Sequence, residues 1–195
     1  MIPRIIGISG AKFSGKSKVA SILCDKYDYN IKSFAEPLKL AAKEIFLLDE
    51  EQLYDPIKKE TIDDRLGISP REIFQVLGTD IFRNNIYKFF PGIKLDNNNI
   101  WITNMNLYIN KNINKKIIID DVRFEDEYNF IKSINGIVIK INRKNNDIID
   151  KHESEIGCKY DYIIDNNSDF IQLEKCIDEF MMNNFGWRFI IFMIL

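Results

Sequence analysis

The segment from Gly10 to Ser17 could hold the phosphates of a nucleotide. It reads, in order, Gly10, Ala11, Lys12, Phe13, Ser14, Gly15, Lys16 and Ser17, which fits the pattern G-x-x-x-x-G-K-[ST] at every fixed position. Glycines let the backbone wrap around an anion, so that successive N–H groups point at phosphate oxygens. In such a loop we expect Lys16 to reach the β- and γ-phosphates and the Ser17 hydroxyl to bind Mg²⁺. The segment therefore predicts a site for a nucleoside triphosphate with Mg²⁺.

The flanking residues supply the elements that such a loop needs. Residues 4–9 form an isoleucine-rich run, typical of a strand buried on both faces of a parallel sheet. Residues 16–26 then predict a helix. A strand before the loop and a helix after it distinguish a phosphate-binding loop from a glycine-rich turn that merely contains a lysine.

An acidic strand end lies further along the chain. Residues 116–121 predict a strand that closes on Asp120 and Asp121. Asp121 is the candidate for a second Mg²⁺ contact, whereas Asp120 points the other way if the strand is regular. The two acids are not followed by D-x-x-G, and the sequence contains no Asn-Lys-x-Asp. A signalling GTPase is therefore disfavoured.

Arg123 follows this strand end by two residues. At the carboxyl edge of the sheet its guanidinium could neutralise charge on a transferring phosphoryl group. The alternative is a salt bridge to one of the acids that follow, which are Glu125, Asp126 and Glu127.

About a hundred residues separate the loop from Asp121, far more than one crossover helix requires. We expect an inserted helical region, residues 36–110, to hold a second substrate. Within it, Ser69, Pro70 and Glu72 carry the signals of a helix start, and the pattern predicts a helix to about Phe89.

A polar stripe runs along this predicted helix. Arg71, Gln75 and Thr79 recur every four residues, and Arg83 follows. On a straight helix Arg71 and Arg83 would be about 18 Å apart along the axis, too far to grip one phosphate. We therefore assign Arg71 to the acceptor phosphate, Gln75 to a base edge, and Arg83 to the reacting centre or a structural pair. An ordinary solvated face is the alternative for both arginines.

The rest of the chain alternates strands with helices. The expected strands cover 30–34, 137–141 and 160–164, and the expected helices cover 35–46, 100–109, 125–134 and 170–182. This order predicts an α/β fold, a single domain over residues 1–195 with a parallel five-stranded sheet between two layers of helices. The polar segment 142–157 could close over the donor nucleotide as a lid, with Arg143 as a donor contact. His152, the one histidine, is interpreted as structural.

Composition excludes several classes of protein. With 27 basic and 29 acidic residues the formal net charge is -2, so no positive field exists to attract a nucleic-acid polymer. The three cysteines form no C-x-x-C, which suggests reduced thiols in an intracellular, cytoplasmic protein, and no secretory signal is visible. The apolar tail, residues 189–195, is much shorter than the roughly 20 residues of a membrane span. We expect it to pack on the core or on a partner subunit rather than contact a membrane.

Five blocks together resemble the deoxynucleoside monophosphate kinases of bacteriophages and large DNA viruses. They are Gly10 to Ser17; Ser33 to Lys39; Pro70 to Glu72 with Gln75 and Leu77 to Asp80; Asp121 to Phe124 with Glu127; and His152 to Glu155. The resemblance implies a three-layer αβα P-loop NTPase fold, Mg²⁺ and ATP, deoxynucleoside monophosphates as acceptors, and often a homodimer. It also suggests that Arg71, Gln75, Thr79 and Arg123 face the acceptor, with Glu36 and Lys39 at the mouth of its pocket. Such enzymes often have aspartate where this chain has Glu36, which bears on sugar or base selectivity.

The expected reaction is thus transfer of the ATP γ-phosphoryl group to a deoxynucleoside 5′-monophosphate. Two alternatives stay open at this point. One is another small-acceptor P-loop kinase, acting on UMP or CMP or on dephospho-coenzyme A. The other is an ATP-binding switch or assembly factor, whose partner would dock on the apolar tail.

Overall fold

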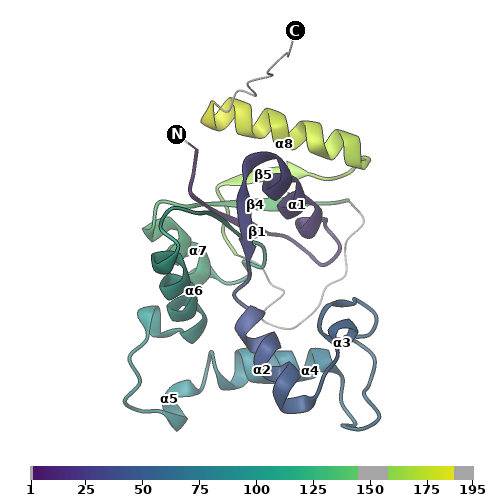
Figure 1. Ribbon diagram of the computed structural model, residues 1–195, viewed down its shortest axis with the longest axis vertical. Coiled ribbons are helices and arrows are strands. Elements are labelled where there is room, and N and C mark those ends of the chain that lie inside the picture. The colour runs from purple at the N-terminus through teal and green to yellow at the C-terminus, as the bar shows by residue number, and fades with distance from the viewer. Residues whose placement is uncertain (1, 145–157, 187–195) are drawn as a thin grey trace. The chain divides into compact units, whose positions relative to one another are not determined.

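The chain folds into two compact units. The computed structural model describes residues 2–144 and 158–186. One unit joins Met1–Lys32 to Ile113–Leu195, and the other is Ser33–Asn112 (Figure 1). The second unit nearly coincides with the region expected to bind the acceptor. The apolar tail, His152 and most of the expected lid lie outside the described residues.

The first unit contains the predicted five-stranded parallel sheet. Its strands are β1 (Ile5–Ser9), β2 (Tyr29–Lys32), β3 (Lys116–Ile119), β4 (Ile137–Asn142) and β5 (Tyr162–Asp165). They pair in parallel in the order β2-β3-β1-β4-β5, and their bounds lie within two residues of those expected. The central strand β1 leads directly into the phosphate-binding loop, at the edge where open α/β sheets bind ligands.

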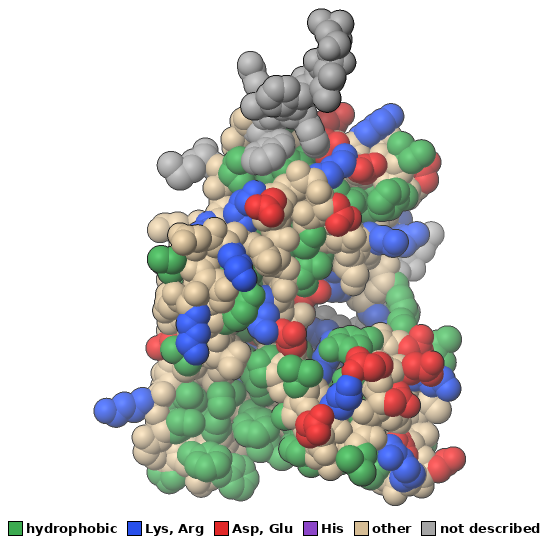
Figure 2. Space-filling view, in the orientation of Figure 1, with side chains coloured by type: hydrophobic (Ala, Val, Ile, Leu, Met, Phe, Trp, Pro, Cys, Tyr) green, Lys and Arg blue, Asp and Glu red, His purple; other side chains and the backbone are tan. Residues whose placement is uncertain are grey.

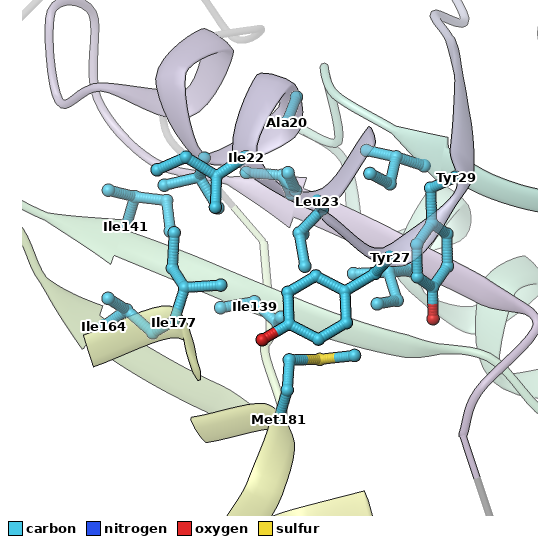
Figure 3. Close-up of a cluster of buried hydrophobic side chains, with 14 of the residues drawn as sticks. Ala20, Ile22, Leu23, Tyr27, Tyr29, Ile139, Ile141, Ile164, Ile177 and Met181 are labelled. Carbon is cyan, nitrogen blue, oxygen red and sulfur yellow. The ribbon is translucent and has the colours of Figure 1, made fainter. Parts of the chain in front are cut away.

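Helices cover both faces of this sheet. Helices α1 (Lys16–Tyr27) and α8 (Phe170–Phe185) bury one face with apolar side chains, and Figure 3 shows the ring of Tyr27 of α1 beside Ile139 of β4 and Met181 of α8. On the other face lies α7 (Glu125–Ser133), so close that a β-carbon on Gly7 of β1 would be 2.7 Å from Ile131. Burial on both faces explains why β1 is apolar at consecutive positions rather than alternating ones.

Helix α1, which starts at the phosphate-binding loop, is fixed to α8 by polar contacts. The Tyr27 hydroxyl donates to Asp178 at 2.6 Å, and Lys26 contacts the same carboxylate at 2.7 Å and Glu174 at 2.9 Å. Burial, followed by the hydrogen bond to Asp178, raises the pKa of Tyr27. The phenol therefore stays protonated and keeps this contact at neutral pH.

The second unit is helical. Its elements are α2 (Glu36–Phe46), α3 (Glu50–Tyr54), α4 (Pro70–Gln75), the π-helix η1 (Val76–Ile81), α5 (Ile86–Phe89), the 3-10 turn η2 (Asp96–Asn98) and α6 (Ile100–Lys111). The sequence did not predict α3, which begins with a capping box between Asp49 and Gln52. Gln52 then donates from its side chain to Asp63 at 2.7 Å, which links α3 to the loop that precedes α4.

The single helix expected from Ser69 to about Phe89 is wrong. The Ser69 capping box and Pro70 start α4 as predicted, but a π-helix follows, in which Phe82 N donates to Leu77 O at 2.9 Å. The chain then turns before α5 begins. Capping residues specify where a helix starts but not its inner geometry, and this π-helix also accepts a hydrogen bond from Trp101 of α6.

The second unit leaves many apolar side chains exposed. Figure 2 shows such side chains grouped where Figure 1 draws α5. Phe89 and Phe90 there are each more than half exposed, as are Ile45, Leu47 and Ile57 elsewhere in the unit. One apolar cluster of this unit has four buried members, which are Ala42, Leu48, Leu53 and Ile73. Further buried apolar residues of the unit include Leu38, Ile86, Trp101, Ile102, Met105 and Ile109.

Candidate active site

The phosphate-binding loop has the backbone that its glycines predict. Gly10 and Gly15 have φ of 141° and 101°, a region that side chains disfavour. Space is also lacking, because a β-carbon at Gly10 would lie 2.4 Å from Ile141 O and one at Gly15 would lie 2.2 Å from Asn166 Nδ2. Phe13 adopts φ 63° without being glycine, which is strained for a bulky residue. The chain therefore wraps tightly at the carboxyl end of β1.

Three backbone amides at the start of α1 precede the first hydrogen bonds of the helix. The first hydrogen bonds of the helix are donated by Lys18 and Val19 to Gly15 O, at 3.0 and 3.1 Å. The amides of Gly15, Lys16 and Ser17 come earlier in the chain and so have no acceptor within the helix. Such amides, at the positive end of the helix dipole, form a phosphate site.

Side chains of the loop also fit a phosphate chain. Lys16 Nζ donates to Gly10 O and to Ala11 O, each at 2.8 Å, which holds the ammonium group against the loop. The hydroxyl of Ser14 is buried and has no hydrogen-bond partner among the described residues. An unpaired buried hydroxyl is costly unless water or a ligand satisfies it. The loop thus combines a cation, an orientable hydroxyl and backbone donors.

Asp120 and Asp121 lie in a turn beyond β3, not on the strand as expected. The alternation of a regular strand therefore does not decide between them. Asp120 N donates to Lys32 O at the end of β2, whereas Val122 N, directly after Asp121, donates to Ile8 O of β1 at 3.1 Å. Asp121 is thus the acid that adjoins the strand leading into the loop. No group of three or more His, Cys, Asp or Glu in the described part of the chain could hold a metal ion by itself.

The turn that carries Arg123 is held by a buried carboxylate. Glu127, 2% exposed in the first turn of α7, accepts hydrogen bonds from the backbone amides of Arg123 and Phe124 at 2.8 and 3.2 Å. Val122, the residue before Arg123, is also buried. Arg123 is therefore held at the same sheet edge as the loop and Asp121.

Arg143 follows β4 at this edge and is exposed. Two hydrogen bonds tie its neighbours to the residues after β5: Asn142 Nδ2 donates to Asp165 at 2.7 Å, and Lys144 N donates to Asn167 at 2.7 Å. The remainder of the expected lid, 145–157, lies outside the described residues.

Asn166 is a residue of this edge that the sequence analysis missed. It follows β5, is 7% exposed, and donates from Nδ2 to Ser14 O of the loop at 2.8 Å. The sequence signal for Asn166 is a polar residue that follows a predicted strand. Asparagine is abundant in this chain, so that signal does not distinguish Asn166 from other asparagines.

In the second unit, the residues expected at the mouth of the acceptor pocket lie on α2. Glu36 is the first residue of this helix, and Lys39 lies over the ring of Tyr54, 4.7 Å from its centre. Helix α2 packs directly on η1, since a β-carbon on Gly78 would be 2.7 Å from Leu38 Cδ2. Glu36 and Lys39 are thus on a helix adjacent to the polar stripe.

The stripe itself is less regular than predicted. Arg71 and Gln75 are partly exposed on α4. Thr79 is only 6% exposed within η1, and Arg83 lies in the turn beyond η1. The distance calculated for Arg71 and Arg83 on a straight helix therefore does not apply. The structure places Arg71 and Gln75 on one helix, with Thr79 as part of the packed π-helix.

A sequence model of the deoxynucleotide monophosphate kinase family matches residues 49–177. A protein of Acanthamoeba polyphaga mimivirus, provisionally named a deoxynucleotide monophosphate kinase, is 39% identical over 188 residues, covering 89% of this chain and 96% of that protein. The chain belongs to the deoxynucleotide monophosphate kinase family. With its loop and sheet, this member of the family is a P-loop nucleotide kinase. The resemblance inferred from the five sequence blocks is confirmed.

Among solved structures, dephospho-CoA kinase from Campylobacter jejuni aligns with a TM-score of 0.48 at 16% identity, over 94% of this chain and 98% of that one. Shikimate kinase from Aquifex aeolicus aligns with a TM-score of 0.49 at 15% identity, over 94% and 99%. The αβα assignment rests on the strand order and helix placement described above, not on these likenesses. Among the described helices, none is long and apolar enough to cross a membrane.

Proposed function

We propose that this deoxynucleotide monophosphate kinase transfers the γ-phosphoryl group of ATP to a deoxynucleoside 5′-monophosphate. An oxygen of the acceptor phosphate bonds to the γ-phosphorus as the bond to the β,γ-bridging oxygen breaks, and the products are a deoxynucleoside diphosphate and ADP. The proposal is supported chiefly by the loop from Gly10 to Ser17 in a chain of this family. In this loop the Lys16 ammonium is hydrogen-bonded to Gly10 O, and backbone amides precede the first hydrogen bonds of α1.

The loop side would stabilise the migrating charge. The ammonium of Lys16 and the amides of Gly15, Lys16 and Ser17 supply positive charge and hydrogen bonds to the phosphates. Ser17 and Asp121 would hold Mg²⁺, which shields the phosphate oxygens and orients them when it is bound. Two side-chain oxygens suit this ion, because Mg²⁺ in such sites keeps waters and phosphate oxygens as its other ligands.

The acceptor side is assigned to arginines and to polar side chains near them in sequence. Arg71 suits the acceptor phosphate and Gln75 a base edge, while Thr79 and Arg83 would complete this side and Glu36 and Lys39 its mouth. Arg123 would align the acceptor and neutralise charge as the group moves. No general base is required, because the acceptor phosphate is already an anionic nucleophile. We expect a cytoplasmic enzyme of small nucleotides, with ATP, Mg²⁺ and Arg143 on the donor side.

An acceptor panel tests this proposal. Purified protein is incubated with ATP, Mg²⁺ and one acceptor at a time: dAMP, dCMP, dGMP, dTMP, UMP, CMP or dephospho-coenzyme A. We expect ADP to form fastest with one or more deoxynucleotides. A sample that binds ATP but forms ADP with no acceptor would refute the proposal, and a preference for UMP, CMP or dephospho-coenzyme A would replace it.

Lys16→Ala provides the matched check on the loop. Loss of one charge-stabilising donor should lower turnover by about a hundredfold to a thousandfold. Lys18→Ala is the control, because Lys18 is an exposed lysine on the same helix whose ammonium lies over the Phe170 ring. Unchanged turnover in Lys16→Ala would contradict the assignment of the loop.

A further inference from the structure

Asn166 contacts the phosphate-binding loop but has no part in the proposed reaction. It is separated from the loop by 152 residues in sequence, and its Nδ2 donates to Ser14 O at 2.8 Å in a buried position. Its own backbone is fixed in turn, because Asn166 N donates to Asn142 O at 2.7 Å. The donor therefore sits on a rigid strand end rather than on a free loop.

The contact determines which way one peptide group points. The carbonyl of Ser14 and the N–H of Gly15 belong to the same planar trans peptide, in which they point in opposite directions. Because the Ser14 carbonyl accepts from buried Asn166, the Gly15 N–H points away from Asn166. Gly15 N is also one of the early amides that have no acceptor within α1.

Glycine alone would not keep this peptide in place. Gly15 has φ 101°, and glycine occupies positive and negative φ with similar ease. A flipped Ser14–Gly15 peptide would present a carbonyl oxygen to the phosphates, which repels them. A fixed donor below the Ser14 carbonyl opposes that flip.

We propose that Asn166 is a positioning residue that holds the Ser14–Gly15 peptide with its N–H toward the nucleotide phosphates. The inference rests on the proposed function of the loop and adds a residue to it. It accounts for a buried asparagine side chain whose partner is a loop carbonyl rather than another part of the sheet. It also accounts for the absence of room at Gly15, since the peptide lies directly on the asparagine amide.

The test uses Asn166→Leu, which keeps the approximate side-chain size without a donor or an added charge. ADP binding is measured by calorimetry in EDTA, so that only the loop and not the metal contributes. We expect the dissociation constant for ADP to rise about tenfold or more, because a misdirected Gly15 amide no longer donates to a phosphate oxygen. The KM for the deoxynucleoside monophosphate should change by less than about twofold, because the acceptor residues are elsewhere.

Two measurements separate positioning from general damage. In ¹⁵N-labelled wild-type protein, ADP should shift the Gly15 amide proton downfield, and Asn166→Leu should abolish this shift. Asn142→Ala is the matched control: its Nδ2 also donates at 2.7 Å at this edge, but to Asp165 instead of the loop. It should bind ADP like the wild type. Asn166→Asp gives a second variant if the leucine protein does not fold, and its carboxylate should weaken ADP binding further.

The outcomes are distinct. If the wild type binds ADP and phosphorylates deoxynucleotides while the folded Asn166 variants bind ADP equally well, the role of Asn166 is overturned and the proposed function stands. If the Asn166 variants lose affinity only in proportion to a loss of melting temperature that Asn142→Ala shares, the role is again overturned. Wild-type protein that binds no ADP would overturn both proposals.

Discussion

The α-carbon of Gly15 lies directly against the side-chain amide of Asn166, with no room for a β-carbon between them. Such a carbon would be 2.2 Å from Asn166 Nδ2, closer than non-bonded atoms approach. Gly15 also has φ 101°. Glycine is therefore required here both for space and for backbone conformation.

Gly15→Ala should abolish nucleotide binding without unfolding the protein. Its β-carbon must displace either the Asn166 amide or the loop, and the strained φ adds on the order of 1–3 kcal/mol of destabilisation. Calorimetry with ADP and thermal melting measure the two effects. Gly92→Ala is the control, because no atom lies within 4 Å of its β-carbon. Wild-type affinity for ADP in Gly15→Ala would contradict this account of the loop.

Asp121→Asn should weaken the response to Mg²⁺. If Asp121 is the Mg²⁺ ligand proposed above, its loss from the turn beyond β3 should lower the affinity for Mg²⁺ in the presence of ADP by at least about tenfold. Asp120→Asn is the natural comparison, because Asp120 lies in the same turn but its amide bonds to Lys32 of β2. Titration of Mg²⁺ into each ADP-bound variant measures the affinity for Mg²⁺. A larger loss of this affinity in Asp120→Asn than in Asp121→Asn would assign the metal contact to Asp120 instead.

Several local features were predictable because short segments determine them. The pattern from Gly10 to Ser17, the isoleucine-rich β1 and the start of α4 at Ser69 each depend on neighbouring residues in sequence. The parallel sheet followed from the alternation of strands and helices.

Other features depended on contacts between distant residues. The π-helix accepts a hydrogen bond from the indole nitrogen of Trp101 at Gly78 O, at 2.9 Å. These two residues are 23 positions apart in sequence. Asn166 reaches Ser14 across 152 positions. No spacing rule within a helix or a strand encodes either contact, which is why the Arg71 stripe and the base of the loop were incompletely predicted.

Arg71→Lys should raise the KM for the acceptor. Lysine keeps the charge but cannot form two parallel hydrogen bonds to a phosphate, which should weaken acceptor binding by about tenfold to a hundredfold. Binding of ADP should be unchanged. Arg4→Lys is the control, since Arg4 donates to Ile113 O in an exposed position of the first unit. Steady-state kinetics with a varied acceptor gives the answer, and an unchanged KM would exclude Arg71 from the acceptor site.

Arg123→Lys should act on kcat instead. Its backbone is fixed by Glu127 at the sheet edge beside the loop, so its guanidinium is assigned to the migrating charge. Removing an interaction made mainly in the transition state lowers kcat and kcat/KM equally, here by about tenfold to a hundredfold. Lys132→Arg serves as control, because Lys132 lies on helix α7, which begins two residues after Arg123, and pairs with Asp161 at 3.0 Å. A rise in KM with unchanged kcat would move Arg123 to ground-state binding.

Asp63 should make the second unit sensitive to acid. The Arg65 guanidinium, followed by the Gln52 side chain, holds the pKa of Asp63 well below its ordinary value of 3.8. A carboxyl group whose pKa is lower in the folded state contributes stability above the unfolded value, and this contribution is lost as the pH falls below about 4 toward the folded value. Asp63→Asn should therefore be less stable than the wild type at pH 7, and the difference should shrink at pH 3. Urea unfolding at both values measures it, with Asp64→Asn as the control because Asp64 is the exposed neighbour. An equal deficit at both pH values would show that Asp63 stabilises the loop through hydrogen bonding alone, without its charge.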